Sequence, residues 1–199
     1  MNDGNIKSKI DITEELLGTA SANPELHKEF IASKAPDAET IEDEVAAIGV
    51  ENAVEKAMTV FPRTADGESF IYDYQIRGFF KEACSCLRKV SGTASSKCKA
   101  FKKEIDGLIF VEPRMCIMDM HGGTIGNCQR PLRAQTAQGE RISLANSETA
   151  PSGTSIEFEV ICYVDSDIEM VKEWLEYGRV KGLGQWRNSG KGKFTVEYL

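Results

Sequence analysis

The sequence predicts an α+β protein with a ferredoxin-like core, in which two helices cover one face of a four-stranded antiparallel sheet. Three observations carry this prediction. Residues 6–12 and 154–164 alternate apolar and polar side chains, as half-buried strands do. Residues 74–90 and 168–177 repeat apolar side chains at helical spacing. With two interruptions set aside, the order is strand, helix, strand, strand, helix, strand, which is that of the split βαβ fold.

Each element of this core has its own sequence signal. Ile6, Ser8, Ile10 and Ile12 define one face of the first strand. The first helix buries apolar residues that include Phe79, Phe80 and Leu87, and a short apolar run at 107–111 supplies the second strand. The third strand follows a turn at Ser152 and Gly153. Residues 165–167 cap the last helix, and the alternating residues 194–198 form the last strand.

Two stretches do not fit the core and are predicted to be insertions into a single domain that spans residues 1–199. Residues 20–60 read as an acidic helical insertion that starts at Asn23 and Pro24. Residues 113–151 have turn chemistry without a long helical pattern, so they read as a β-hairpin or extended loop. This second insertion is rich in arginine and contains Arg114, Arg130, Arg133 and Arg141.

The charge is divided unevenly along the chain. The formal net charge is −7, which by itself argues against a nucleic-acid-binding protein. Residues 1–70 hold 15 acidic and 6 basic residues, whereas residues 71–199 hold 16 acidic and 18 basic residues. The chain therefore has an acidic part and a basic part.

Composition also predicts the compartment. No apolar run is long enough to span a bilayer, and the N-terminus is polar rather than basic and then apolar. The six cysteines lack paired C-x-x-C spacing, and nothing in the sequence marks a secreted protein. We therefore expect a cytoplasmic protein with reduced thiols, no membrane partner, no metal site and no cofactor.

Residues 177–194 form the stretch with the clearest chemistry. They contain five glycines and five cations, Arg179, Lys181, Arg187, Lys191 and Lys193, and no acidic residue. Such a backbone can approach an anion closely while cations converge on it. The alternative is that Gly178 caps the preceding helix and the later glycines only make turns.

Three motifs in the second part of the chain resemble the RAMP superfamily, whose RRM-like proteins are RNA-binding subunits of CRISPR effector complexes. Residues 182–194 (GLGQWRNSGKGKF) resemble the glycine-rich loop of that superfamily. Residues 147–158 (SETAPSGTSIEF) are similar to its strand opening, and residues 74–80 (YQIRGFF) to the turn into its first helix. The resemblance covers residues 72–199. The acidic insertion matches no pattern of the superfamily, and the overall composition is similar to that of a phage or prophage protein.

The resemblance implies an RRM-like fold and a set of nucleic-acid-binding residues. The glycine-rich loop would lie near the RNA backbone, with its cations on phosphates, and Trp186 or Phe194 would stack a base. The residues expected to bind nucleic acid are Lys181, Gly182, Gly184, Trp186, Arg187, Gly190, Lys191, Lys193, Arg77, Arg130 and Arg133.

Three functions follow from these observations. The first is a RAMP-like subunit that holds single-stranded RNA, with CRISPR effector subunits or further copies of itself as partners. The second is a phage-encoded interference protein, resembling an anti-CRISPR protein, whose acidic segment mimics a nucleic acid or displaces a CRISPR subunit. The third is a metal-independent RNA endonuclease. The chain has two histidines, and of these His121, before Gly122, is a better candidate than His27 for proton transfer.

Overall fold

The larger sheet contains the four strands expected for the core. The computed structural model describes residues 4–22, 58–136 and 139–199, with the side chains of 132–144 left aside. In this sheet β11 (Phe194–Tyr198) pairs with β1 (Asn5–Ile12), and β1 pairs with β10 (Ser155–Cys162), all antiparallel. The other edge of β10 pairs first with β6 (Ile109–Glu112) and then with β7 (Met115–Asp119), and β5 (Phe70–Tyr72) adds to β7.

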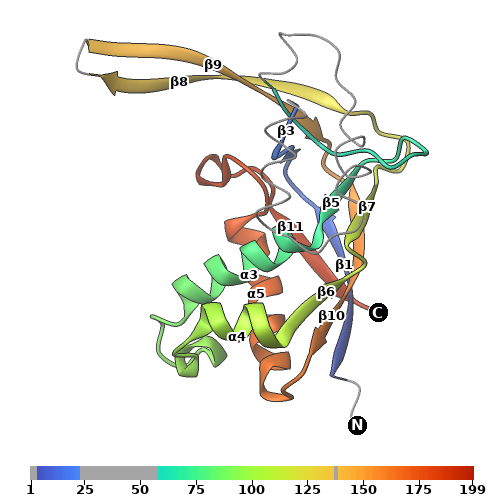
Figure 1. Ribbon diagram of the computed structural model, residues 1–199, viewed down its shortest axis with the longest axis vertical. Helices are drawn as coiled ribbons and strands as arrows, with labels where there is room; N and C mark the ends of the chain where they lie inside the picture. The colour runs from blue at the N-terminus through green and yellow to red at the C-terminus, as the bar shows by residue number, and fades with distance from the viewer. Residues whose placement is uncertain (1–3, 23–57, 137–138) are drawn as a thin grey trace.

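Three α-helices are found in the described ranges, and Figure 1 shows them on the same side of this sheet. They are α3 (Asp73–Leu87), α4 (Phe101–Leu108) and α5 (Ser166–Lys181). The apolar faces of α3 and α5 join the inward positions of β1 and β10 in one hydrophobic core. At its centre Phe80 and Trp174 are fully buried, with ring centroids 5.6 Å apart. Since both rings come from helices, the core depends on how α3 and α5 pack together.

The second sheet carries the predicted hairpin. Its long strands β8 (Gly126–Thr136) and β9 (Gly139–Ala150) pair antiparallel and extend as an arm from the body of the protein (Figure 1). At its base β9 also pairs with β2 (Leu16–Leu17) and with β4 (Thr59–Val60), and β4 pairs with β3 (Ala20–Ser21). The chain runs from β1 into β2 and from β9 into β10, so both connections lead from one sheet to the other.

The observed fold is α+β and compatible with a ferredoxin-like fold. Two predicted boundaries need correction. Residues 107 and 108 end α4 instead of starting a strand, because β6 begins only at Ile109. The hairpin is shorter than the predicted 113–151, because β7 belongs to the larger sheet. The acidic insertion predicted at 20–60 lies almost entirely outside the described residues, which include only its ends, β3 and β4.

Candidate nucleic-acid interface

The glycine-rich loop leaves the end of α5 and is closed by its own backbone. Gly182 is the C-cap of α5, and Leu183 N–H donates to Gly192 O at 2.7 Å. Gly182, Gly184, Gly190 and Gly192 all have positive φ, between 70° and 87°. At Gly192 a Cβ would stand 1.9 Å from Leu183 O, so only glycine allows this closure. Turn geometry, the alternative prediction, is therefore enough to explain why these positions are glycine. This explanation does not depend on any ligand of the loop.

The segment that joins β1 to β2 holds the loop in place. Thr13 N–H donates to Lys193 O at 2.8 Å, and Gly192 N–H donates to Glu15 O at 2.9 Å. Gln185 Nε2 donates to Gly18 O at 3.0 Å. These bonds connect residues more than 160 positions apart, so the loop has a defined position relative to both sheets.

Three of the loop's predicted phosphate-binding cations are paired with acids. Glu82 of α3 accepts from Lys181 at 2.8 Å and from Arg187, and Glu15 accepts from Lys191 at 2.7 Å. Burial would raise the pKa of Glu82, but the two cations outweigh it and hold this pKa below its ordinary value. The hydrogen bond to Glu15 raises the pKa of Lys191. The positive charge of these side chains is thus largely compensated inside the protein.

Lys193 differs from the other loop cations. It is half-buried and has no ion pair with any residue in the described ranges. Its backbone carbonyl, in contrast, accepts from Thr13 and Glu14. Lys193 is thus anchored through its main chain, and no acid of the described residues pairs with its side chain.

Trp186 is the exposed residue of the site, and the buried Arg130 lies beside it. The Trp186 residue is 41% exposed, and its φ of 54° places a bulky residue in the left-handed region. The Arg130 guanidinium carbon lies 5.3 Å from the centroid of the Trp186 ring. A cation at this distance is attracted to the face of the indole. One side of the ring is therefore held by β8 of the hairpin, although Trp186 itself lies in the loop.

Arg130 is buried and pairs with neutral side chains in the described residues. It is 7% exposed, its Nη1 donates to Ser147 Oγ at 3.0 Å, and its Nη2 donates to Gln185 Oε1 at 2.8 Å. Within the part of the chain that the structure describes, it makes no ion pair. Its positive charge therefore lies beside Trp186, and among the described residues it meets the neutral groups of Ser147 and Gln185.

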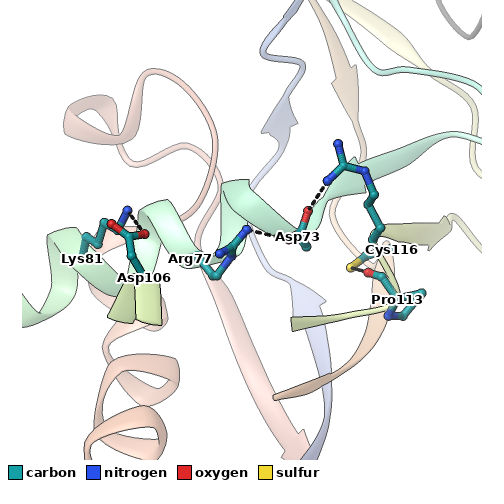
Figure 2. A network of polar contacts seen from close by, with 7 residues as sticks. Asp73, Arg77, Lys81, Asp106, Pro113 and Cys116 are labelled. Atoms are coloured by element: carbon teal, nitrogen blue, oxygen red, sulfur yellow. Dashed lines mark hydrogen bonds and ion pairs between the residues drawn. The ribbon is translucent and has the colours of Figure 1, made fainter. Parts of the chain in front are cut away.

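The other predicted binding residues lie elsewhere or are not described. Arg77 pairs with Asp73 at 2.8 Å near the start of α3 (Figure 2). Arg114 approaches the same carboxylate at 3.7 Å. No hydrogen bond or ion pair of the described residues joins Arg77 to the glycine-rich loop. The side chain of Arg133 lies outside the described residues. The structure thus brings Arg130 to the loop but leaves Arg77 in a separate network.

Two expectations about the loop are wrong. Phe194 cannot stack a base, because it is 1% exposed and packs against Phe79 with ring centroids 5.3 Å apart. Gly178 does not cap a helix, because α5 continues to Lys181. The role of Gly178 is instead to make room for the ring of Phe194, which a Cβ would meet at 2.1 Å.

His121 lies between an acid and a hydroxyl. Its Nδ1 is 3.3 Å from Asp119 Oδ2, and its Nε2 is 3.0 Å from Ser155 Oγ. The His121 side chain is 52% exposed, and Ser155 is buried. The hydrogen bond at Nε2 and the carboxylate beside Nδ1 orient the imidazole, as a proton-transfer group requires.

Neither a metal cluster nor a membrane-spanning helix is found in the described ranges. No group of three or more histidine, cysteine or acidic side chains there is placed to hold a metal ion. No helix there combines the length and the apolar character needed to cross a bilayer. The six cysteines are free thiols.

The acids that compensate the loop were missed by the sequence reasoning. Glu82 lies 105 positions from Arg187, and Glu15 lies 176 positions from Lys191, so no local pattern connects them. Asp119 could have been found, since it stands two residues before His121. Ser155 could not have been found from the sequence, because its approach to His121 depends on the pairing of β7 with β10.

No protein-family model matches the sequence, and no curated protein sequence matches it either. Among solved structures, the fold is similar to one chain of the cryo-EM structure of the Type III-B Cmr-beta bound to cognate target RNA. That similarity has a TM-score of 0.48 at 10% sequence identity and covers 98% of this protein. The protein spans 60% of the length of that chain.

Proposed function

We propose that this protein binds single-stranded RNA as a RAMP-like subunit of an effector assembly, with Trp186 as the base-stacking residue. In this proposal β1, α3, β6, β10, α5 and β11 are a ferredoxin-like core, interrupted by the acidic segment and by the hairpin. The observation that carries the proposal is the exposed Trp186 beside Arg130, which makes no ion pair within the described residues. The motif resemblance of the glycine-rich loop supports the choice of RNA.

The conformation of Trp186 supports a role beyond packing. A bulky residue at positive φ is strained, and such strain persists only where the surrounding structure over-determines it. Folding alone would favour glycine or asparagine at this position. Stacking of the ring on a base would explain why an exposed tryptophan occupies this position. Such stacking is worth about 1–3 kcal/mol.

The cations of the loop have a defined part in this proposal. Lys181 and Arg187 share the single carboxylate of Glu82, so this group carries a net charge of about +1 at neutral pH. A phosphate can replace Glu82 as the partner of either cation. Phosphate binding then exchanges one ion pair for another, which gives moderate affinity and a weaker dependence on salt than two unpaired cations would give.

The test is the affinity for a single-stranded RNA, measured for wild type and Trp186→Asn over a salt series. Asparagine tolerates the left-handed region, so the variant should be at least as stable as wild type. It should lose RNA affinity about 5- to 100-fold, the equivalent of one stacked base. Tyr163→Asn is the matched control, since Tyr163 is an aromatic residue with 73% exposure outside the site.

Several results would contradict the proposal. Wild type without RNA affinity at low salt would exclude it, as would equal affinities of wild type and Trp186→Asn. The mass of the protein in solution, with and without RNA, measures whether copies assemble along the strand. Because Trp174 is fully buried, quenching of tryptophan fluorescence by RNA should come from Trp186 and should be absent in the Asn variant.

A second candidate function is RNA cleavage, favoured by the geometry of His121. When the substrate displaces Ser155 Oγ from Nε2, this nitrogen could accept the proton of a ribose 2′-hydroxyl while that oxygen attacks the adjacent phosphorus and the 5′-oxygen leaves with a proton from water. Asp119 would hold the imidazole during this transfer. Single-stranded RNA incubated with chelator should then be cut by wild type and left intact by His121→Ala. Equal cleavage, or none in either sample, would remove this candidate.

A further inference from the structure

A partly enclosed cavity of about 320 Å³ lies between α3, the β2–β3 segment and the glycine-rich loop. Its wall is mainly apolar and includes Leu17, Phe61, Ile71, Phe79 and Leu183. Polar groups enter from Gln75, Thr19 and the Glu82–Arg187 ion pair. An apolar wall with a few convergent polar groups is the usual composition of a small-molecule site.

Gly78 keeps this cavity open. It lies inside α3, is exposed, and contributes to the cavity wall. A Cβ built on it would meet nothing within 4 Å, so neither packing nor backbone conformation requires glycine here. Glycine is among the poorest helix formers, and almost any other residue would favour α3. Because Gly78 has no side chain, the space beside it at the cavity stays open.

The cavity adjoins the Trp186 surface. A second depression of about 370 Å³ is lined by Trp186 and Asn188, and it shares Glu82, Gly184 and Arg187 with the first. The Glu82–Arg187 pair therefore belongs to both. A ligand with a flat apolar part in the cavity and an anionic part near Arg187 and Lys181 would meet complementary groups at both ends.

We propose that this cavity accepts one nucleobase of a nucleotide, whose phosphate pairs with Lys181 and Arg187. The inference rests on the proposed RNA binding and extends it to a base-specific subsite. The volume is near the lower limit of about 300 Å³ for ligand pockets, so it suits one base and excludes a peptide helix. The nucleotide could belong to an RNA strand or be free in solution.

Gln75 supplies the group that would read the base. Its Oε1 accepts from Tyr72 N–H at 2.7 Å, and its Nε2 donates to Thr19 Oγ1. A side-chain amide has two donors and two acceptor lone pairs, so one of each remains for a ligand. Because the amide is held by two bonds, its free donor and acceptor have fixed directions. Bases are recognised by stacking on aromatic rings together with hydrogen bonds to their edges.

The experiment fills the cavity from Gly78. Binding of the four nucleoside 5′-monophosphates and of a single-stranded RNA is measured for wild type, Gly78→Leu and the control Gly107→Leu. Gly107 is also an exposed helical glycine with nothing within 4 Å of a built Cβ, but it does not line the cavity. We expect wild type and Gly107→Leu to bind at least one monophosphate, and Gly78→Leu to bind it at least tenfold more weakly. Ala20→Leu, from the opposite wall, repeats the test if Gly78→Leu does not fold.

The outcomes separate this inference from the proposed function. If wild type binds RNA and Gly78→Leu binds RNA and monophosphates equally well, the cavity inference is overturned and RNA binding stands. If wild type binds a monophosphate that Gly78→Leu loses, but binds no RNA, the subsite holds for a free nucleotide and the RNA proposal fails. Equal losses in Gly78→Leu and Gly107→Leu would also overturn the inference, since the effect would not come from the cavity.

Discussion

The ring of Phe194 lies directly over Gly178, where a Cβ would stand 2.1 Å from Phe194 Cζ. This contact joins α5 to β11 at the base of the glycine-rich loop. Gly178→Ala should therefore destabilise the protein by about 1–3 kcal/mol, because the ring must move within a filled core. The free energy of unfolding from urea titration measures this effect.

Gly78→Ala is the control for that substitution. The same methyl group is added inside a helix, but it meets nothing within 4 Å. Gly78→Ala should stabilise the protein by about 0.5–1 kcal/mol, since alanine is the better helix former. If both variants gained stability, Phe194 would not be packed on Gly178 as described.

Ser95 links the buried Trp174 to a carboxylate. Trp174 Nε1 donates to Ser95 Oγ at 2.8 Å, and Ser95 Oγ donates in turn to Glu173 Oε2. Ser95→Ala would leave the indole N–H buried without a partner, which should cost about 1–3 kcal/mol. Ser96→Ala removes an exposed hydroxyl and should change stability by less than about 0.5 kcal/mol. Equal urea midpoints for the two variants would contradict this network.

The core was predictable because its signals are local. Alternation identified β1 and β10, and helical spacing identified α3 and α5, since each element must bury one face whatever its neighbours are. The pairing of Leu16 with Ala150 in the second sheet joins residues far apart in the chain and left no such signal.

The candidate site was predictable only in part, for the same reason. The glycines of the loop indicate turns in the sequence. All four, Gly182, Gly184, Gly190 and Gly192, have positive φ. The compensation of Arg187 by Glu82 depends on the approach of α3 to the loop, which only the tertiary structure determines. Phe194 was misassigned because an aromatic residue after a glycine-rich loop reads equally well as a ligand contact or as a core residue.

The cysteines should differ sharply in reactivity. Burial raises the pKa of Cys116 and of Cys162 to about 12, so both are almost entirely thiols at pH 8. Cys86 is exposed on α3. A disulfide reagent at pH 8 should therefore label Cys86 within minutes and reach Cys116 and Cys162 only after unfolding. Mass spectrometry of labelled peptides identifies the sites, and rapid labelling of Cys116 in the folded protein would contradict its burial.

The last prediction concerns Glu82, which competes with any phosphate for Lys181 and Arg187. Glu82→Gln keeps the shape of the side chain and removes this competitor. RNA affinity should rise, and the salt dependence should steepen by about 0.7 in logarithmic slope for each cation that gains a phosphate. Glu176→Gln, an exposed acid on α5, controls for the change in net charge. A gain no larger than that of Glu176→Gln would show that these two cations do not meet phosphates.

The same substitution should change how stability depends on pH. The folded pKa of Glu82 lies below its ordinary value of 4.5, so its ion pairs stabilise the protein above that pH and are lost as the pH falls through the lower folded pKa. Glu82→Gln should thus be less stable than wild type at pH 7, and the difference should shrink below pH 4.5. In the same acidic range the RNA affinities of the two proteins should converge, because protonation of Glu82 releases the same two cations. Urea titrations at a series of pH values, paired with RNA titrations, test both statements on one pair of proteins.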